Sequence, residues 1–349
     1  MSELRVLTGA RGVAAWFVVL YHVRVTFPAL PVQALLAKGY LAVDFFFLLS
    51  GFVIWLAWHD RIREPGAVAV FLRKRVARIW PLHLAMLAFA CLLALSLRAT
   101  GRDDPAFPFA ELPLHLLLVQ NWGFTQALAW NDPAWSISAE AAAYLLFPPL
   151  VLATDWRRLS TPALLTVAAA ILLALHLAMR GEPTLGSDIP RFGVLRCLAE
   201  FTVGGIVCAL WLRRPAAALR PALLAAALFA ALLAGAPETL VVPAALAAAL
   251  LALAATADRR GNPLERPLFH RLGEISYATY LCHFLLWKAW KLAFVTAEVA
   301  PIHLATYLLA VLIASSLLYD RIEVPAQAWL NGVRVRPRVR RPARPPAPR

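Results

Sequence analysis

The chain has 349 residues, of which 61% are hydrophobic and only 15% are charged, and its net charge is +14. Soluble domains carry about 25% charged residues, so this composition excludes an ordinary soluble protein. The apolar residues gather in runs of about 20, the length that crosses a bilayer as a helix. We therefore predict an all-α integral membrane protein. Its basic excess would face anionic lipid, so nucleic-acid binding is not needed to explain the charge.

Taken in chain order, the apolar runs predict a bundle of about ten transmembrane helices. A weaker apolar patch at 112–119 is too short to span and contains His115, so we expect a loop or a re-entrant segment there. The first run should stay in the protein, because it lacks a signal-peptide cleavage site and Arg11 interrupts its apolar core. The predicted spans are 6–28, 40–58, 77–97, 138–154, 161–179, 194–212, 218–236, 238–257, 273–294 and 302–320.

The distribution of Lys and Arg predicts that both termini are cytoplasmic. With the N-terminus placed inside, 25 of the 34 basic residues fall on the cytoplasmic side and 8 fall outside, while Arg196 lies within a span. Basic residues that flank membrane helices collect on the cytoplasmic side. The predicted chain therefore enters and leaves the bundle from the same compartment.

Two units of different composition follow one another. We assign residues 1–325 to a transmembrane domain and 326–349 to a basic Arg/Pro-rich cytoplasmic tail, which we expect to be disordered and held near lipid by charge. The sequence predicts no metal site and does not indicate an oligomeric state. The cysteines all fall in predicted spans without metal-ligand spacing, and they are Cys91, Cys197, Cys208 and Cys282.

Two basic side chains share one face of the first predicted helix. Arg11 and His22 are eleven residues apart, so they differ by about 20° around the axis and by roughly 16 Å along it. A charged residue within a membrane span costs about 2.5–3.5 kcal/mol and is rarely kept there without a use. We interpret the pair as functional. Alternatively, Arg11 reaches the near interface and His22 hydrogen-bonds a neighbouring helix.

The second predicted span begins with an acid at the depth of His22. Asp44 lies about 6 Å below the outer end of its span, and His22 lies about 9 Å from the outer end of the first. In adjacent antiparallel helices this carboxylate could contact the imidazole and orient it as a general base. Alternatively, backbone amides near the helix start satisfy Asp44.

A basic cluster marks the cytoplasmic end of the third span. Arg73, Lys74, Arg75 and Arg78 occur within six residues, and Pro81 follows them. Such a cluster suits the phosphates of a di- or triphosphate-bearing cofactor. Part of it is also the ordinary cytoplasmic excess of positive charge, so its spacing alone is not specific.

The fourth span starts from the outer side with acidic and aromatic residues. Glu140 lies in its first turn, where the helix dipole favours an acid. The composition of the preceding segment, with Trp130, Asn131, Asp132 and Trp135, suits sugar stacking and hydroxyl recognition. We predict a catalytic role for Glu140 and a substrate-binding role for Trp135. For Glu140, a purely structural role at the helix start is the alternative.

Polar residues also recur at helical spacing in later spans. Ser276, Tyr280 and His283 share one helix face, which should point into the bundle or a wet cavity. Tyr280 and His283 are therefore predicted substrate-binding residues. Arg196 and Glu200 are four residues apart, and we favour a structural ion pair between them.

With these segments in order, the chain resembles the acyltransferase 3 family of polytopic membrane proteins. The resemblance extends from Arg5 to Pro325, and its segments are specific as an ordered set. They are Arg-x10-His at 11–22, Gly-x-x-x-Val-Asp-Phe-Phe-Phe-Leu-Leu-Ser-Gly-Phe at 39–52, Arg-Ile-x-Pro at 78–81, Trp-Ser-x-Ser-x-Glu at 135–140, Ile-Ser-Tyr-x-x-Tyr-Leu-x-His at 275–283 and Ile-Glu-x-Pro at 322–325.

The resemblance implies a ten-helix enzyme of a bacterial-type inner (cytoplasmic) membrane. Such an enzyme would move an acyl group, usually acetyl, from cytoplasmic acyl-coenzyme A to a hydroxyl of a carbohydrate or lipid-linked glycan at the membrane or its outer face. The resemblance implies that Arg11 and His22 are essential. It also implies that the basic residues Arg73, Arg75 and Arg78 bind the donor.

Two features depart from the family pattern. After Glu140, which the resemblance marks as a site residue, the family often continues Gln-Phe-Tyr, whereas three alanines precede Tyr144 here. Acceptor contacts by those polar residues are therefore in doubt. Some members also carry a fused outer hydrolase-like domain, whereas a short basic tail follows the last predicted span here. We expect the membrane unit or a separate partner to complete the transfer.

The residues and the resemblance lead to one mechanistic hypothesis. Coenzyme A phosphates bind the basic cluster near Arg11, and the pantetheine arm extends towards His22. Oriented by Asp44, His22 then deprotonates an acceptor hydroxyl or carries the acyl group itself. The alternatives are a glycolipid transporter or flippase, although its usual internal repeats are not visible, and a phospholipid or sterol acyltransferase acting on the inner leaflet.

Overall fold

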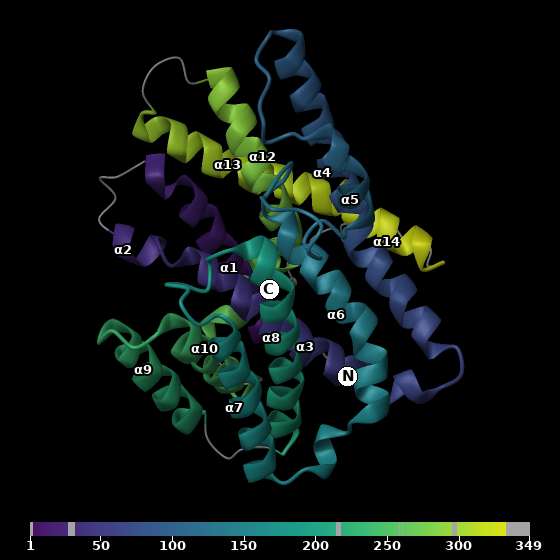
Figure 1. The fold of residues 1–349 in the computed structure, drawn as a ribbon, viewed down its shortest axis with the longest axis vertical. Helices are drawn as coiled ribbons and strands as arrows, with labels where there is room; N and C mark the ends of the chain where they lie inside the picture. The colour runs from purple at the N-terminus through teal and green to yellow at the C-terminus, as the bar shows by residue number, and fades with distance from the viewer. Residues whose placement is uncertain are drawn as a thin grey trace, which may run out of the picture.

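The computed structural model describes residues 3–26, 32–213, 218–257, 259, 261–294 and 299–332. Within these residues every regular element is a helix, as the all-α prediction requires. The long helices form a bundle with α3, α6 and α8 near its middle and α9 at one edge (Figure 1). The α-helices are α1 (Arg5–Val23), α2 (Gln33–Leu36), α3 (Ala42–Trp58), α4 (Ala67–Ala99), α5 (Leu112–Leu117), α6 (Ala134–Ala153), α7 (Thr161–Ala178), α8 (Ile189–Leu212), α9 (Leu219–Leu233), α10 (Glu238–Ala254), α11 (Pro267–Glu274), α12 (Ser276–Phe294), α13 (Pro301–Leu318) and α14 (Val324–Leu330).

The described chain is that of a multi-pass membrane protein. Seven stretches are long and apolar enough to cross a bilayer. Two further apolar helices, α9 and α10, are shorter. Helix α12 matches the ninth predicted span, but its lysines and histidine make it more polar. A count of ten spans and a cytoplasmic location of both termini therefore stay predictions. The seven stretches are Arg5–Thr26, Gln33–Trp58, Ala67–Ala99, Ala134–Ala153, Thr161–Ala178, Ile189–Leu212 and Pro301–Leu330.

Polar contacts between distant segments join helix ends that the predicted topology places on the same side. Each partner comes from a different span or its flanking loop, so the predicted alternation of helix directions is consistent with the packing. The pairs are Lys38–Glu238 at 2.6 Å and Lys288–Asp104 at 3.7 Å on the predicted outer side, and Arg213–Thr161 at 2.7 Å and Arg271–Asp320 at 2.8 Å on the predicted inner side.

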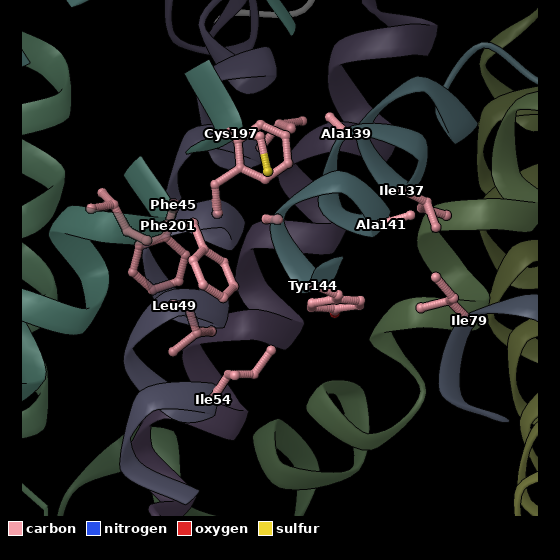
Figure 2. Close-up of a cluster of buried hydrophobic side chains, with 14 of the residues drawn as sticks. Phe45, Leu49, Ile54, Ile79, Ile137, Ala139, Ala141, Tyr144, Cys197 and Phe201 are labelled. Carbon is pink, nitrogen blue, oxygen red and sulfur yellow. The ribbon is translucent and has the colours of Figure 1, made fainter. Parts of the chain in front are cut away.

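Helices α3 and α8 approach closely because glycines line their contact. A Cβ atom added at Gly51 would lie 1.9 Å from the carbonyl oxygen of Phe201, and one at Gly204 would lie 2.0 Å from that of Leu48. Small residues permit such backbone approach between membrane helices, where packing rather than water drives association. Figure 2 shows Phe45 of α3 beside Phe201 of α8 in the core around this contact.

Glycines likewise set the contact between α1 and α11. A Cβ atom at Gly273 would lie 1.9 Å from the Thr8 carbonyl oxygen, and one at Gly12 would lie 2.7 Å from the Gly273 amide nitrogen. This contact places the Gly273 carbonyl beside Arg11, the first basic residue of the predicted pair. The carbonyl thereby fixes the position of the Arg11 side chain.

Helix α4 begins ten residues before the predicted third span. It includes 33 residues, about 50 Å at 1.5 Å per residue, which exceeds the thickness of a bilayer core. Its first six residues are apolar, but the basic residues Arg73, Lys74, Arg75 and Arg78 separate them from the longer apolar run, so hydrophobicity alone does not extend the span back to Ala67. The basic cluster therefore lies within a helix and not in a loop.

The predicted boundary between transmembrane domain and tail falls inside α14. The first residues of the predicted tail are thus helical, because Val324–Leu330 continues directly from the π-helical segment Tyr319–Glu323. The rest of the predicted disordered tail, residues 333–349, lies outside the described residues.

Candidate functional site

A cavity of about 160 Å³ lies between α1, α3, α4, α6 and α12. Side chains of α3, among them Val43 and Phe46, give it an apolar wall, and hydroxyls of α6 and α12 line the other side. Several residues that the sequence singled out meet here although they are far apart in the chain. These are Arg11, Arg75, Arg78, Glu140 and Tyr280.

Arg11 is anchored at the edge of this cavity by backbone. Its Nε and Nη2 atoms donate hydrogen bonds of 3.2 and 2.8 Å to the carbonyl oxygen of Gly273. The remaining guanidinium nitrogen, Nη1, takes no part in these bonds. A cation held by a neutral carbonyl keeps its full charge available to a ligand.

The basic cluster of α4 divides into residues inside and outside the cavity. Arg75 and Arg78 line it, whereas Arg73 is exposed and does not. Arg75 and Arg78 are three residues apart and share the helix face that meets the cavity, whereas Arg73 lies on another face. Donor binding by Arg73, as the sequence suggested, therefore finds no support in this geometry.

Arg75 presents an unused donor to the cavity. Its guanidinium lies 5.7 Å from the ring centre of Tyr144, and its buried Nε atom has no hydrogen-bond partner among the described residues. Leaving a buried donor without a partner is costly, so such a group is suited to a ligand.

Arg78 forms an ion pair with a carboxylate of the membrane stretch Pro301–Leu330. Its Nη1 atom donates to Oε1 of Glu323, which is 1% exposed, and its guanidinium lies 5.1 Å from the ring centre of Tyr277. Glu323 belongs to a π-helical segment, a distortion frequent at functional sites. The sequence analysis did not assign Glu323 to the site, although the closing Ile-Glu-x-Pro segment contains it.

Glu140 is the only acid among the described residues that line the cavity. The Ser50 hydroxyl donates to its carboxylate, and Tyr144, four residues later on the same helix, lines the cavity with it. Ser50 and Tyr144 were not predicted as site residues. The four-residue spacing of Glu140 and Tyr144 on one helix face was the signal that could have found the second.

His22 and His283 form a direct pair beyond the cavity. The Nδ1 atom of His22 lies 3.2 Å from Nε2 of His283, and the ring centres are 4.9 Å apart. Neither ring lines the cavity. The ring of Tyr280 lines it and lies 6.1 Å from the His283 ring, so Tyr280 separates the cavity from the pair.

The predicted contact between Asp44 and His22 is wrong. Asp44 is fully buried, and its Oδ1 atom accepts from Nη2 and Nε of Arg196 at 2.6 and 3.2 Å. The close approach of α3 and α8 brings this guanidinium to the carboxylate, and a buried charge requires the nearest opposite charge. The expected Arg196–Glu200 ion pair is therefore also replaced, because Arg196 bonds Asp44.

The tryptophans around the start of α6 pack inwards. Trp135 is 7% exposed, with its ring centre 5.3 Å from the Arg196 guanidinium, and Trp130 is fully buried. Asn131 donates 2.9 Å to the carbonyl oxygen of Leu281. Burial also raises the pKa of Asp132 in this loop. The indoles are thus not available for sugar stacking in this arrangement, which removes the geometric support for Trp135 as a substrate-binding residue.

This cavity lies in a chain that matches known acyltransferases. Residues 5–320 match the acyltransferase domain model of the acyltransferase 3 family. The chain belongs to this family. It is therefore an acyltransferase, and the family resemblance inferred from the ordered segments is confirmed.

Three curated proteins illustrate the relationship. The chain is 33% identical to acyltransferase MdmB of Streptomyces mycarofaciens over 84% of this chain and 82% of that protein. It is 27% identical to exopolysaccharide production protein ExoZ of Rhizobium meliloti over 70% and 75%. It is 38% identical to protein 2 in the picA locus of Rhizobium radiobacter, over 38% of this chain and 75% of that protein. No solved structure matches the chain.

Proposed function

We propose that this protein transfers an acyl group, acetyl in the simplest case, from cytoplasmic acyl-coenzyme A to a hydroxyl of a carbohydrate or lipid-linked glycan. The transfer takes place at an inner (cytoplasmic) membrane or its outer face. The observation that carries the donor assignment is the charge of the cavity. Arg11, Arg75 and Arg78 face a single carboxylate, so the described lining has a net charge of +2.

The guanidinium groups fit the phosphates of coenzyme A. Arginine forms strong, geometrically defined bonds with phosphate oxygens, and the Arg75 Nε atom is buried with no hydrogen-bond partner among the described residues. At about 160 Å³ the cavity is smaller than the roughly 300–1,000 Å³ that encloses a drug-sized ligand. It would therefore hold only part of the donor, and the adenosine end would remain at the cytoplasmic mouth.

His22 is the proposed general base. Its Nε2 atom has no hydrogen-bond partner among the described residues, whereas Nδ1 is bonded. This nitrogen would take the proton of the acceptor hydroxyl as the oxygen attacks the thioester carbonyl, and it would return the proton to the departing thiolate. Because the Tyr280 ring stands between the cavity and His22, the donor arm would have to displace that ring to reach the imidazole.

The carbohydrate acceptor is supported by the name of one relative. ExoZ is described as an exopolysaccharide production protein, and its similarity covers 70% of the present chain. A glycan presents many hydroxyl groups at the membrane surface. A hydroxyl group is the nucleophile that the proposed base would activate.

Two measurements test the proposal. Purified protein in lipid nanodiscs should transfer label from radioactive acetyl-coenzyme A to glycan extracted from the membrane of the source cells. Mass analysis of surface glycans and lipids should show loss of an acetyl-sized increment when the gene is deleted. Transfer to phospholipid alone would contradict the proposed function. So would the absence of any labelled product together with unchanged glycan and lipid masses after deletion of the gene.

The His22→Ala variant tests the proposed base. It should abolish transfer, because the neighbouring basic nitrogen, Nε2 of His283, belongs to a fully buried side chain, while membrane insertion and the elution profile of the purified protein stay unchanged. Turnover within about tenfold of wild type would rule out His22 as the general base.

A further inference from the structure

Backbone carbonyls determine where the protons of the two paired imidazoles lie. The Nδ1 atom of His22 lies 3.0 Å from the carbonyl oxygen of Val18, and that of His283 lies 3.1 Å from that of Thr279. A carbonyl oxygen only accepts, so each neutral ring carries its proton on Nδ1. The Nε2 atom of His283 is then an unprotonated acceptor. It lies 3.2 Å from the His22 Nδ1–H group, which thus has two acceptors.

His283 cannot itself touch an acyl donor or acceptor in this arrangement. It is fully buried, whereas His22 is half-buried. Helix α13 fixes its backbone, because the Tyr307 hydroxyl donates 2.9 Å to the His283 carbonyl oxygen. Within the described part of the chain no carboxylate contacts either ring. Among the described residues, the only hydrogen-bonding group from another helix at His22 Nδ1 is therefore His283.

We propose that His283 is the positioning residue of His22. By accepting the Nδ1–H bond together with the Val18 carbonyl, it favours the His22 tautomer whose Nε2 atom is unprotonated and directed away from the pair. When Nε2 takes a proton, the positive charge of the ring is partly carried by Nδ1–H, and the His283 lone pair stabilises it. A buried carboxylate has this role in the Ser-His-Asp arrangement, and here a neutral ring takes it in place of the expected Asp44.

The step balances within His22 and the substrates. The acceptor O–H bond breaks as an N–H bond forms at His22 Nε2, and His283 neither gains nor loses a proton. The inference rests on the proposed function, because it assigns a role relative to the proposed base. It predicts a loss of turnover rather than of donor binding, since His283 is remote from the cationic cavity.

Two substitutions of similar chemistry separate positioning from mere packing. In His283→Asn the amide reaches the place of the ring Nδ1 atom, so it can still donate to Thr279, but it is too short to reach His22. In His283→Gln the longer amide reaches the place of Nε2 and can accept the His22 Nδ1–H bond. The two variants thus differ in the one contact that the proposal invokes.

The expected result is a split between these variants. His283→Asn should lower kcat roughly 10- to 100-fold, the loss typical when a group that orients a histidine is removed, with the donor KM within about twofold of wild type. His283→Gln should retain kcat within about threefold. Equal kcat values for the two variants, or a loss expressed mainly in donor KM, would overturn the proposal.

A spectroscopic measurement on the wild-type protein tests the tautomer that the proposal requires, independently of the His283 variants. In wild-type protein labelled with ¹⁵N-histidine, the His22 signals can be assigned by their absence in His22→Gln. They should show a protonated Nδ1 and an unprotonated Nε2 at neutral pH. A proton on His22 Nε2 would refute the inference, whereas a lack of acyl transfer by wild-type protein would count against the proposed function alone.

Discussion

Arg73, Arg75 and Arg196 are chemically identical side chains in three different surroundings. Arg73 is exposed, Arg75 faces the cavity with a free buried donor, and Arg196 is buried against a carboxylate. A guanidinium in water is satisfied by solvent, whereas a buried one needs a partner from the protein or a ligand. The same residue type can therefore be inert, ligand-binding or structural, and its neighbours decide which.

The first prediction compares two arginines of α4. Arg75→Ala should raise the donor KM by roughly 10- to 150-fold, because a hydrogen bond from a charged group contributes about 1.5–3 kcal/mol. Arg73→Ala is the matched control, since it removes the same charge two residues away but outside the cavity, and it should change KM by less than about threefold. Similar donor KM values for both variants in a steady-state assay would show that the cavity does not bind the donor.

The second prediction concerns Asp44, whose observed partner is Arg196. Asp44→Ala should lower the free energy of unfolding by about 3–5 kcal/mol, because it leaves a buried cation unpaired. Combining Asp44→Leu with Arg196→Met removes both charges and should restore most of the melting temperature and the activity. If the double variant is stable but inactive, Asp44 has a part in the chemistry beyond this ion pair.

At the scale of helices, glycines determine which elements can meet. The contacts α3–α8 and α1–α11 both require a missing side chain, and both bring a polar residue to its partner. Through the first, Arg196 reaches Asp44, and through the second, Arg11 reaches Gly273. Local glycine positions thus have consequences for residues of the core and the cavity.

The third prediction follows from the α3–α8 contact. Gly204→Ala should destabilise the protein by about 1–3 kcal/mol or more, because its new methyl group would lie 2.0 Å from the Leu48 carbonyl oxygen and would force the helices apart. Ala170→Val, on an exposed position of α7, is the control and should leave the melting temperature in detergent nearly unchanged. Equal melting temperatures for both variants would contradict the close contact.

At the scale of the whole molecule, the polar contacts between distant loops agree with the alternating directions of the predicted spans. Lys38 bonds Glu238, and Arg271 bonds Asp320, each within one predicted side. The cytoplasmic excess of Lys and Arg then orients the bundle in the membrane. In this predicted orientation, Arg75 and Arg78 lie towards the cytoplasmic end of α4, the side from which the proposed donor would enter.

The fourth prediction tests that orientation. In a protein whose four cysteines are replaced by alanine or serine, Arg102→Cys should react with a membrane-impermeant maleimide added to intact cells. Arg158→Cys should react only after the cells are permeabilised, because its loop is predicted to be cytoplasmic. Both positions are exposed, so steric protection does not explain a difference. The reverse labelling pattern would invert the topology and with it the proposed donor side.

The sequence by itself determined the membrane class, the positions of most long helices, the family and the residues of greatest chemical interest. Hydrophobicity and helical spacing are local properties, so apolar runs and one-face pairs such as Arg11 and His22 can be recognised along the chain. The start of α4 and the short helices α2, α5 and α14 could not be placed reliably, because basic residues interrupt the apolar run of α4 and the other three are too short to give a clear periodic signal.

The tertiary structure alone decided the partners of these residues. Asp44 and Arg196 are 152 positions apart, and Arg78 and Glu323 are 245 apart, so no local pattern links them. A helix face can be deduced from spacing, but the helix that packs against it depends on the whole bundle. For this reason the sequence could not show that Asp44 pairs with Arg196 of α8 and not with His22. Nor could it show that His22 contacts His283 of α12.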